Sequence, residues 1–71
     1  MTDTKALEAA IVAAGVMKKH ICSQLGLTFQ GLSDKVNGRT EFKASEIRIM
    51  QDVLRLSNEE RDRIFFASSC D

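Results

Sequence analysis

Apolar residues recur along this chain at helical spacing in five separate stretches. The spacing predicts helices over residues 5–14, 18–25, 29–36, 44–54 and 58–67, with glycine or polar residues between most of them. Proline is absent, and the many alanine, leucine, lysine and glutamate residues favour helix throughout. The pattern therefore predicts an all-α fold, a compact domain of five helices. Residues 1–3 and 68–71 are expected to be disordered ends.

The apolar positions that share one face of each helix make up the predicted core. Phe42 is added to them because an apolar residue just before a helix commonly packs on its fourth residue, here Ile47. Ile49 falls off the core face. The predicted core consists of Leu7, Ala10, Ile11, Ala14, Ile21, Cys22, Leu25, Leu27, Leu32, Val36, Phe42, Ile47, Met50, Val53, Leu54, Leu56, Ile64 and Phe65.

Strong helix-end signals surround the third helix. Gly26 can adopt the left-handed conformation that ends a helix. Thr28 is placed to cap the next one, and Asn37 with Gly38 closes it. The chain between residues 18 and 38 is therefore predicted to be a short helix, a tight turn and a second short helix.

The spacing of the small residue Cys22, the turn residue Gly26, the apolar Leu32 and the closing Val36-Asn37-Gly38 resembles the helix-turn-helix of lambda-repressor-like DNA-binding domains (Cro/CI, also called XRE-type). The resemblance covers residues 1–71 as a single domain. It implies a compact five-helix fold around a central helix-turn-helix, and it places the chain among small Cro-like phage regulators.

The resemblance also implies a set of DNA contacts. Gln30 is the main candidate for base reading, since its amide can pair with adenine. The other base-reading candidates are Phe29, Ser33 and Asp34, and the candidates for backbone contact are Lys18, Lys19, Thr28, Lys35, Asn37, Arg39 and Lys43. Lys18 and Lys19 have an alternative interpretation as a solvated charge pair. Asp34 would repel nearby phosphates.

Two helix starts carry opposite signals. Met17 and His20 stand where the family usually has a capping Ser or Thr and a Glu, so the second helix lacks a capping box. Ser57 and Glu60, in contrast, form an intact capping box at the start of the fifth helix, and Thr4 is the expected cap of the first.

Apolar surface is predicted to remain at the C-terminal end. Phe66 lies about 100° around the helix from Phe65, which is one residue step. Phe66, with Ile49, is therefore the candidate dimer interface, because small Cro-like proteins often pair through this region. The alternative is that Phe66 completes the core.

Charge and composition limit the possible functions. The chain has 71 residues and a net charge of zero, yet residues 15–43 carry three more basic than acidic side chains. A weakly basic face is therefore expected. Neither Cys22 nor Cys70 lies in a metal-ligand spacing, so both are expected to be free thiols, without metal or cofactor. No catalytic arrangement is recognisable, so we expect no enzyme. No membrane-spanning run or signal sequence is present, and we expect a cytoplasmic protein of a bacterial or phage-infected cell.

Two functions follow as hypotheses. The first is a sequence-specific transcriptional repressor that binds a pseudo-palindromic DNA operator as a homodimer. The second is an antirepressor or modulator that binds a partner repressor protein through the helix-turn-helix face. Phe29 would then be an apolar anchor. Zero net charge, Asp34 and the missing capping box of the second helix suit this second hypothesis.

Overall fold

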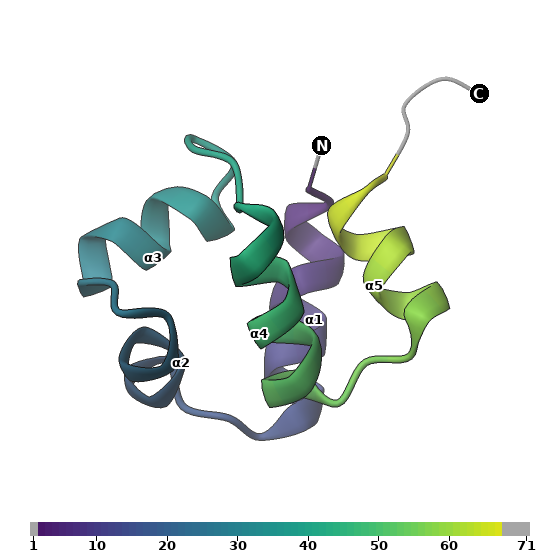
Figure 1. The fold of residues 1–71 in the computed structure, drawn as a ribbon, viewed down its shortest axis with the longest axis horizontal. Coiled ribbons are helices and arrows are strands. Elements are labelled where there is room, and N and C mark those ends of the chain that lie inside the picture. The colour runs from purple at the N-terminus through teal and green to yellow at the C-terminus, as the bar shows by residue number, and fades with distance from the viewer. Residues whose placement is uncertain (1, 68–71) are drawn as a thin grey trace.

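The computed structural model describes residues 2–67 and is built from five helices (Figure 1). They are α1 (Thr4–Ala14), α2 (Lys18–Leu25), α3 (Phe29–Val36), α4 (Ala44–Leu54) and α5 (Asn58–Phe65). All regular structure within residues 2–67 is helical, which confirms the predicted all-α class. None of these helices has the length and apolar character that a membrane crossing requires.

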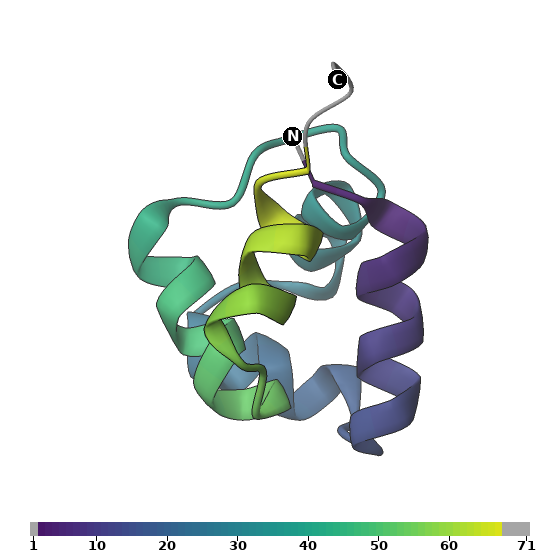
Figure 2. The same cartoon turned by 90° about the vertical axis from the view of Figure 1, so that its right-hand side faces the viewer.

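Helices α1 and α4 are central, because each of them packs on three other helices. Helix α2 packs on α3 and α4, whereas α1 packs on α3, α4 and α5. Figures 1 and 2 show α3 and α5 at opposite sides of the molecule, with α1 and α4 between them. Helices α3 and α5 are therefore separated by α1 and α4.

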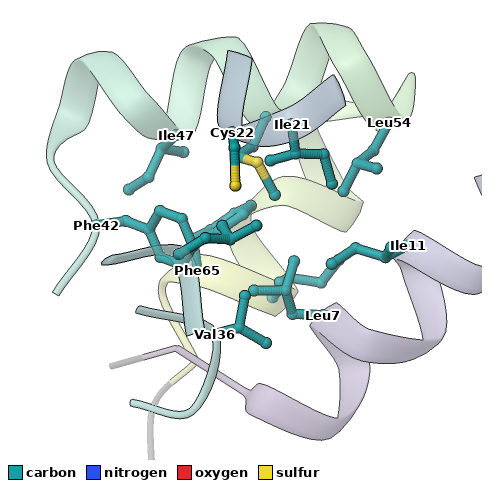
Figure 3. Close-up of a cluster of buried hydrophobic side chains, with 12 residues drawn as sticks. Leu7, Ile11, Ile21, Cys22, Val36, Phe42, Ile47, Leu54 and Phe65 are labelled. Carbon is teal, nitrogen blue, oxygen red and sulfur yellow. The ribbon is translucent and has the colours of Figure 1, made fainter. Parts of the chain in front are cut away.

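One apolar cluster holds the helices together (Figure 3). Phe42 and Phe65 meet edge to face at its centre, with ring centroids 5.1 Å apart and an interplanar angle of 79°, a favoured geometry for aromatic pairs. The buried apolar residues are Leu7, Ile11, Ile21, Cys22, Leu32, Val36, Phe42, Ile47, Met50, Leu54, Ile64 and Phe65. All twelve were predicted core positions.

The remaining predicted core positions are less enclosed. Five of them are only partly buried against the cluster: Ala10, Leu25, Leu27, Val53 and Leu56. Ala14 is exposed, so its assignment to the core was wrong. It is the last residue of α1 and lies beyond Ile11, the last buried residue of that helix.

The N-terminal end of α1 also differs from the prediction. Asp3, not Thr4, caps the helix, because the Ala6 N–H donates to Asp3 Oδ1 at 3.0 Å. The Asp3 N–H donates to the Ile64 carbonyl at 2.7 Å and so ties this end to α5. Asp3 is thus an ordered residue, contrary to the expectation of a disordered 1–3 segment. The prediction for residues 1 and 68–71 lies outside the described residues.

The C-terminal helix begins as predicted and ends early. The Glu60 N–H donates to Ser57 Oγ at 3.0 Å, and the Ser57 N–H donates to Glu60 Oε1 at 2.9 Å, so the capping box is confirmed. These hydrogen bonds hold the pKa of Glu60 below its ordinary value of 4.5. The helix ends at Phe65, two residues before the predicted end, and Phe66 has left the helical conformation with φ −120° and ψ 33°.

Candidate nucleic-acid interface

A tight turn fixes α3 relative to α2. Gly26 has φ 69° and ψ 32°, the left-handed conformation that the sequence predicted. The Leu27 N–H then donates to the Cys22 carbonyl at 3.0 Å, and Thr28 Oγ1 accepts the Gly31 N–H at 3.0 Å. Because the oxygen of Thr28 is used as a cap, its hydroxyl hydrogen stays available for a donor contact.

Helix α3 is anchored on one side and open on the other. Leu32 and Val36 are buried in the core. Phe29, Gln30 and Asn37 are exposed, while Ser33 and Asp34 are half-buried. All four predicted base-reading candidates thus lie on α3, and the backbone candidate Asn37 follows directly at its end.

Hydrogen bonds between successive turns order this open side. Gln30 Nε2 donates to Asp34 Oδ1 at 3.0 Å. Asn37 Nδ2 donates to Ser33 Oγ at 3.1 Å. Both pairs are separated by four residues, the spacing at which side chains on a helix meet. The polar side chains of α3 are therefore oriented before any ligand arrives.

Arg39, in the link after α3, contacts the polar side chains on the open side of this helix. Its Nη1 lies 3.2 Å from Asp34 Oδ1, the oxygen that also accepts from Gln30. The backbone holds the link in place, since the N–H groups of Arg39 and Thr40 both donate to the Asp34 carbonyl, at 2.8 and 3.3 Å. The Arg39 side chain is 64% exposed and retains donors for an anion.

Lys35 is not on the open surface, contrary to its predicted role as a phosphate contact. Its Nζ lies 3.0 Å from Glu46 Oε1 on α4 and donates to the Glu41 carbonyl at 2.9 Å. The same nitrogen lies 5.9 Å from the centroid of the Phe42 ring. The side chain is only 11% exposed, so this charge is used inside the protein.

Sequence reasoning missed Glu46, the buried partner of Lys35. Burial raises the pKa of this carboxyl group, but the Lys43 N–H at 2.8 Å and the Lys35 ammonium outweigh it, and the pKa lies below 4.5. The available signal was its position three residues after Lys43, at the third residue of α4, where a glutamate commonly accepts from the backbone before a helix.

The other basic candidates lie at the start of α2 and before α4. Lys18 Nζ forms an exposed ion pair with Glu8 Oε1 on α1 at 3.5 Å, while Lys19 and Lys43 are exposed. Met17 precedes α2 in an extended conformation and offers no side-chain cap, as the sequence predicted. The first N–H groups of α2, which begins with Lys18 and Lys19, therefore lack a side-chain acceptor.

A hollow of about 210 Å³ adjoins the open side of α3. Its lining combines polar side chains from α1, α2 and α3 and from the residue after α3 with apolar side chains of α3. The lining residues are Glu8, Lys18, Phe29, Leu32, Ser33, Val36 and Asn37. Phe29, at its rim, is 62% exposed. The sequence predicted the exposed Phe29 but not the hollow, because Glu8 comes from a helix that is distant in the chain.

The predicted dimer residues occupy a different part of the surface. Phe66 is 56% exposed and borders a hollow of about 250 Å³ formed by α4 and α5. Ile49 is half-buried and borders a neighbouring hollow. Both hollows include Ala44 and Arg48, so Phe66 and Ile49 belong to one continuous region.

No other chemistry is evident in the described part of the chain. Among residues 2–67, no group of three or more His, Cys, Asp or Glu side chains is placed to hold a metal ion. Cys22 is a buried free thiol, and Cys70 lies outside the described residues. Comparison with protein-family models, with curated proteins and with solved structures finds no match to this chain.

Proposed function

We propose that this protein is a sequence-specific DNA-binding transcriptional regulator that represses through a pseudo-palindromic operator. The main support is the open side of α3, which presents Phe29, Gln30 and Ser33 along a single helix with Arg39 beside it. An α-helix fits the major groove of DNA, where base edges carry a distinctive pattern of donors and acceptors. The resemblance of residues 18–38 to the lambda-repressor-like motif supports the same function.

In this proposal, Gln30 pairs with adenine, Ser33 makes a less discriminating hydrogen bond, and Phe29 packs on thymine methyl groups. The phosphate backbone is contacted by the exposed groups around α3: Lys18, Lys19, Thr28, Asn37, Arg39 and Lys43. Lys35 is left out of this set, because its ammonium group is bound to Glu46.

The proposed functional unit is a homodimer that places two copies of α3 about one helical turn of DNA apart. Phe66 and Ile49 are the candidate contacts between the copies. The protein would act in the cytoplasm of a bacterial or phage-infected cell, by occupying DNA rather than by catalysis, and without a cofactor.

The test is selection of binding sites from a randomised double-stranded DNA library, followed by titration of the selected duplex at low ionic strength. We expect enrichment of a two-fold symmetric sequence. Gln30→Ala should remove the preference at one position of each half-site, and Arg39→Ala should weaken binding to all sequences. The matched control is Arg63→Ala, which removes an exposed arginine from α5, the helix on the other side of the molecule. Absence of any enrichment would refute the proposal.

A second function, binding to a partner repressor through the same face, is favoured by one observation. Phe29 is 62% exposed at the rim of an apolar hollow, and aromatic anchors are typical of protein interfaces. Under this alternative, Phe29→Ser should abolish capture of the partner while Gln30→Ala leaves it intact. Under the DNA proposal, Gln30→Ala changes base preference and Phe29→Ser mainly lowers affinity.

A further inference from the structure

We propose that Asp34 sets the base preference of Gln30 by holding its side-chain amide in one orientation. The inference rests on the proposed DNA-binding function and names the residue that makes α3 selective. Asp34 Oδ1 accepts from Gln30 Nε2 at 3.0 Å, one helical turn away, on the side of α3 that faces solvent. Asp34 is thus a positioning residue that acts through Gln30.

The chemistry of the two groups fixes the orientation. An ionised carboxylate only accepts hydrogen bonds, so the amide nitrogen of Gln30, and not its oxygen, must face Asp34. One of the two N–H bonds is used in this contact. The amide oxygen and the other N–H remain, and these are the acceptor and donor that pair with N6 and N7 of adenine. Without Asp34, the amide can turn over, and the oxygen and nitrogen exchange places.

Asp34 also restrains the nearest arginine. Arg39 Nη1 lies 3.2 Å from the same carboxylate oxygen. This ion pair holds a cation close to α3 but offsets part of its attraction to phosphate, and the carboxylate itself repels phosphate. Asp34 therefore lowers general affinity for DNA while it raises discrimination between bases. Removal of the Asp34 carboxylate should therefore raise the general affinity for DNA and lower the discrimination between bases.

The test compares the wild-type protein with four variants, on the duplex that the wild-type protein selects and on duplexes with a single base changed. Asp34→Ala removes the carboxylate and leaves a residue that favours helix. Glu41→Gln is the charge control, since it removes one negative charge from the exposed link between α3 and α4. Gln30→Ala and the double variant D34A/Q30A complete a cycle that measures whether Asp34 acts through Gln30.

We expect the wild-type protein to prefer adenine about tenfold at the position that Gln30 reads, the size typical of one bidentate pair. Asp34→Ala should reduce this preference to roughly twofold. It should also bind random duplex DNA more tightly, with a salt dependence that is steeper by about one unit per protomer. Glu41→Gln should retain the preference. In the Gln30→Ala background, the further change D34A should not alter base preference.

Two other kinds of result distinguish a failure of the DNA-binding proposal from a failure of the role of Asp34 alone. If wild-type protein selects no sequence, the DNA-binding function and this inference both fail. If it selects a sequence but Asp34→Ala keeps the full adenine preference, or D34A/Q30A loses more discrimination than Q30A, only the role of Asp34 is overturned. Circular dichroism and thermal unfolding of each variant identify a loss of fold, and Asp34→Asn then repeats the charge change with a side chain of the same shape.

Discussion

Glu46 and Lys35 form the most enclosed ion pair in the described part of the chain, with side chains 12% and 11% exposed. Each member of the pair makes a further hydrogen bond to the backbone: the Lys43 N–H donates to Glu46, and the Glu41 carbonyl accepts from Lys35. A pair of this kind gives little net stability compared with apolar residues, but the loss of one member leaves the other charge uncompensated. The pair thus fixes the link after α3 against α4.

The first prediction concerns removal of one charge of this pair. Glu46→Gln should lower the free energy of unfolding by about 1–3 kcal/mol, because the Lys35 ammonium loses its charged partner in a nearly buried position. The measurement is urea denaturation at pH 7. Glu59→Gln, on an exposed position of α5, is the matched control and should change stability by less than about 0.5 kcal/mol. Equal effects of the two variants would show that the ion pair is not stabilising.

The second prediction is a pH dependence with a defined sign. The pKa of Glu46 in the folded protein lies below the ordinary value of 4.5, so the folded state favours the ionised carboxylate. The contribution of Glu46 to the free energy of unfolding is therefore present above pH 4.5. It is lost as the pH falls through the lower pKa of the folded state. Thermal unfolding followed from pH 7 to pH 3 should show stability falling less steeply for Glu46→Gln than for the wild type. Parallel curves would contradict the assignment.

Helix α2 begins without a side-chain cap. Met17 is 71% exposed and in an extended conformation, and no side chain accepts from the first amides of the helix. The backbone of Met17, with φ −76° and ψ 141°, already has the extended conformation of a capping residue. A capping hydroxyl should therefore fit at this position without movement of the backbone.

The third prediction follows directly. Met17→Ser should raise the free energy of unfolding by about 1 kcal/mol relative to Met17→Ala, since serine supplies the missing acceptor and alanine does not. Both variants lose the same exposed methionine side chain, which isolates the hydrogen bond. Chemical denaturation measures the difference. If serine gives no more stability than alanine, the helix start does not depend on a side-chain cap.

The fourth prediction uses one substitution at two glycines. Gly26→Ala should destabilise by about 1–2 kcal/mol, because φ is 69° and a Cβ is strained in that conformation. Gly31→Ala should stabilise by roughly 0.5–1 kcal/mol, because it lies inside α3 and an added Cβ would meet Thr28 Oγ1 at an ordinary 3.4 Å. Thermal unfolding of both variants gives the signs. A shift of both in the same direction would contradict this account.

The elements were largely predictable from sequence, and the reasons are local. Gly26 and Thr28 determine the turn before α3 through their own backbone and side-chain chemistry, and Ser57 with Glu60 does so for α5. Interactions between distant residues were not predictable. Lys35 was placed on the DNA-facing surface, because its partner Glu46 lies eleven residues later and pairs with it only in the folded chain.

At the scale of the whole molecule, the two proposed interfaces are separate. Helix α3 and helix α5 lie on opposite sides of the molecule (Figures 1 and 2). A surface on α4 and α5 can thus join two copies without covering the side chains of α3. Phe66 and the side chains of α3 can therefore be altered independently.

The fifth prediction tests the dimer surface. Phe66→Ser should raise the dimer dissociation constant at least tenfold, because Phe66 is an exposed aromatic residue next to the hollow between α4 and α5. The monomer fold should be retained, since Phe66 lies outside the buried cluster. Sedimentation equilibrium measures the effect. Val12→Ser, at a residue that is 77% exposed on α1, is the control and should leave association unchanged. A wild-type chain that stays monomeric at high concentration would contradict the proposed dimer.

The last prediction concerns salt, because the proposed DNA binding by a chain of zero net charge would depend on a local group of cations. The exposed basic candidates are Lys18 and Lys19 at the start of α2, and Arg39 and Lys43 in the link between α3 and α4. If a dimer neutralises eight phosphates with them, the slope of log affinity against log salt concentration should be about −7. Arg39→Ala should reduce its magnitude by about two units per dimer, whereas Arg63→Ala on α5 should not change it. Fluorescence anisotropy on the selected duplex gives the slope. An equal change in both variants would mean that overall charge, rather than the group around α3, attracts the DNA.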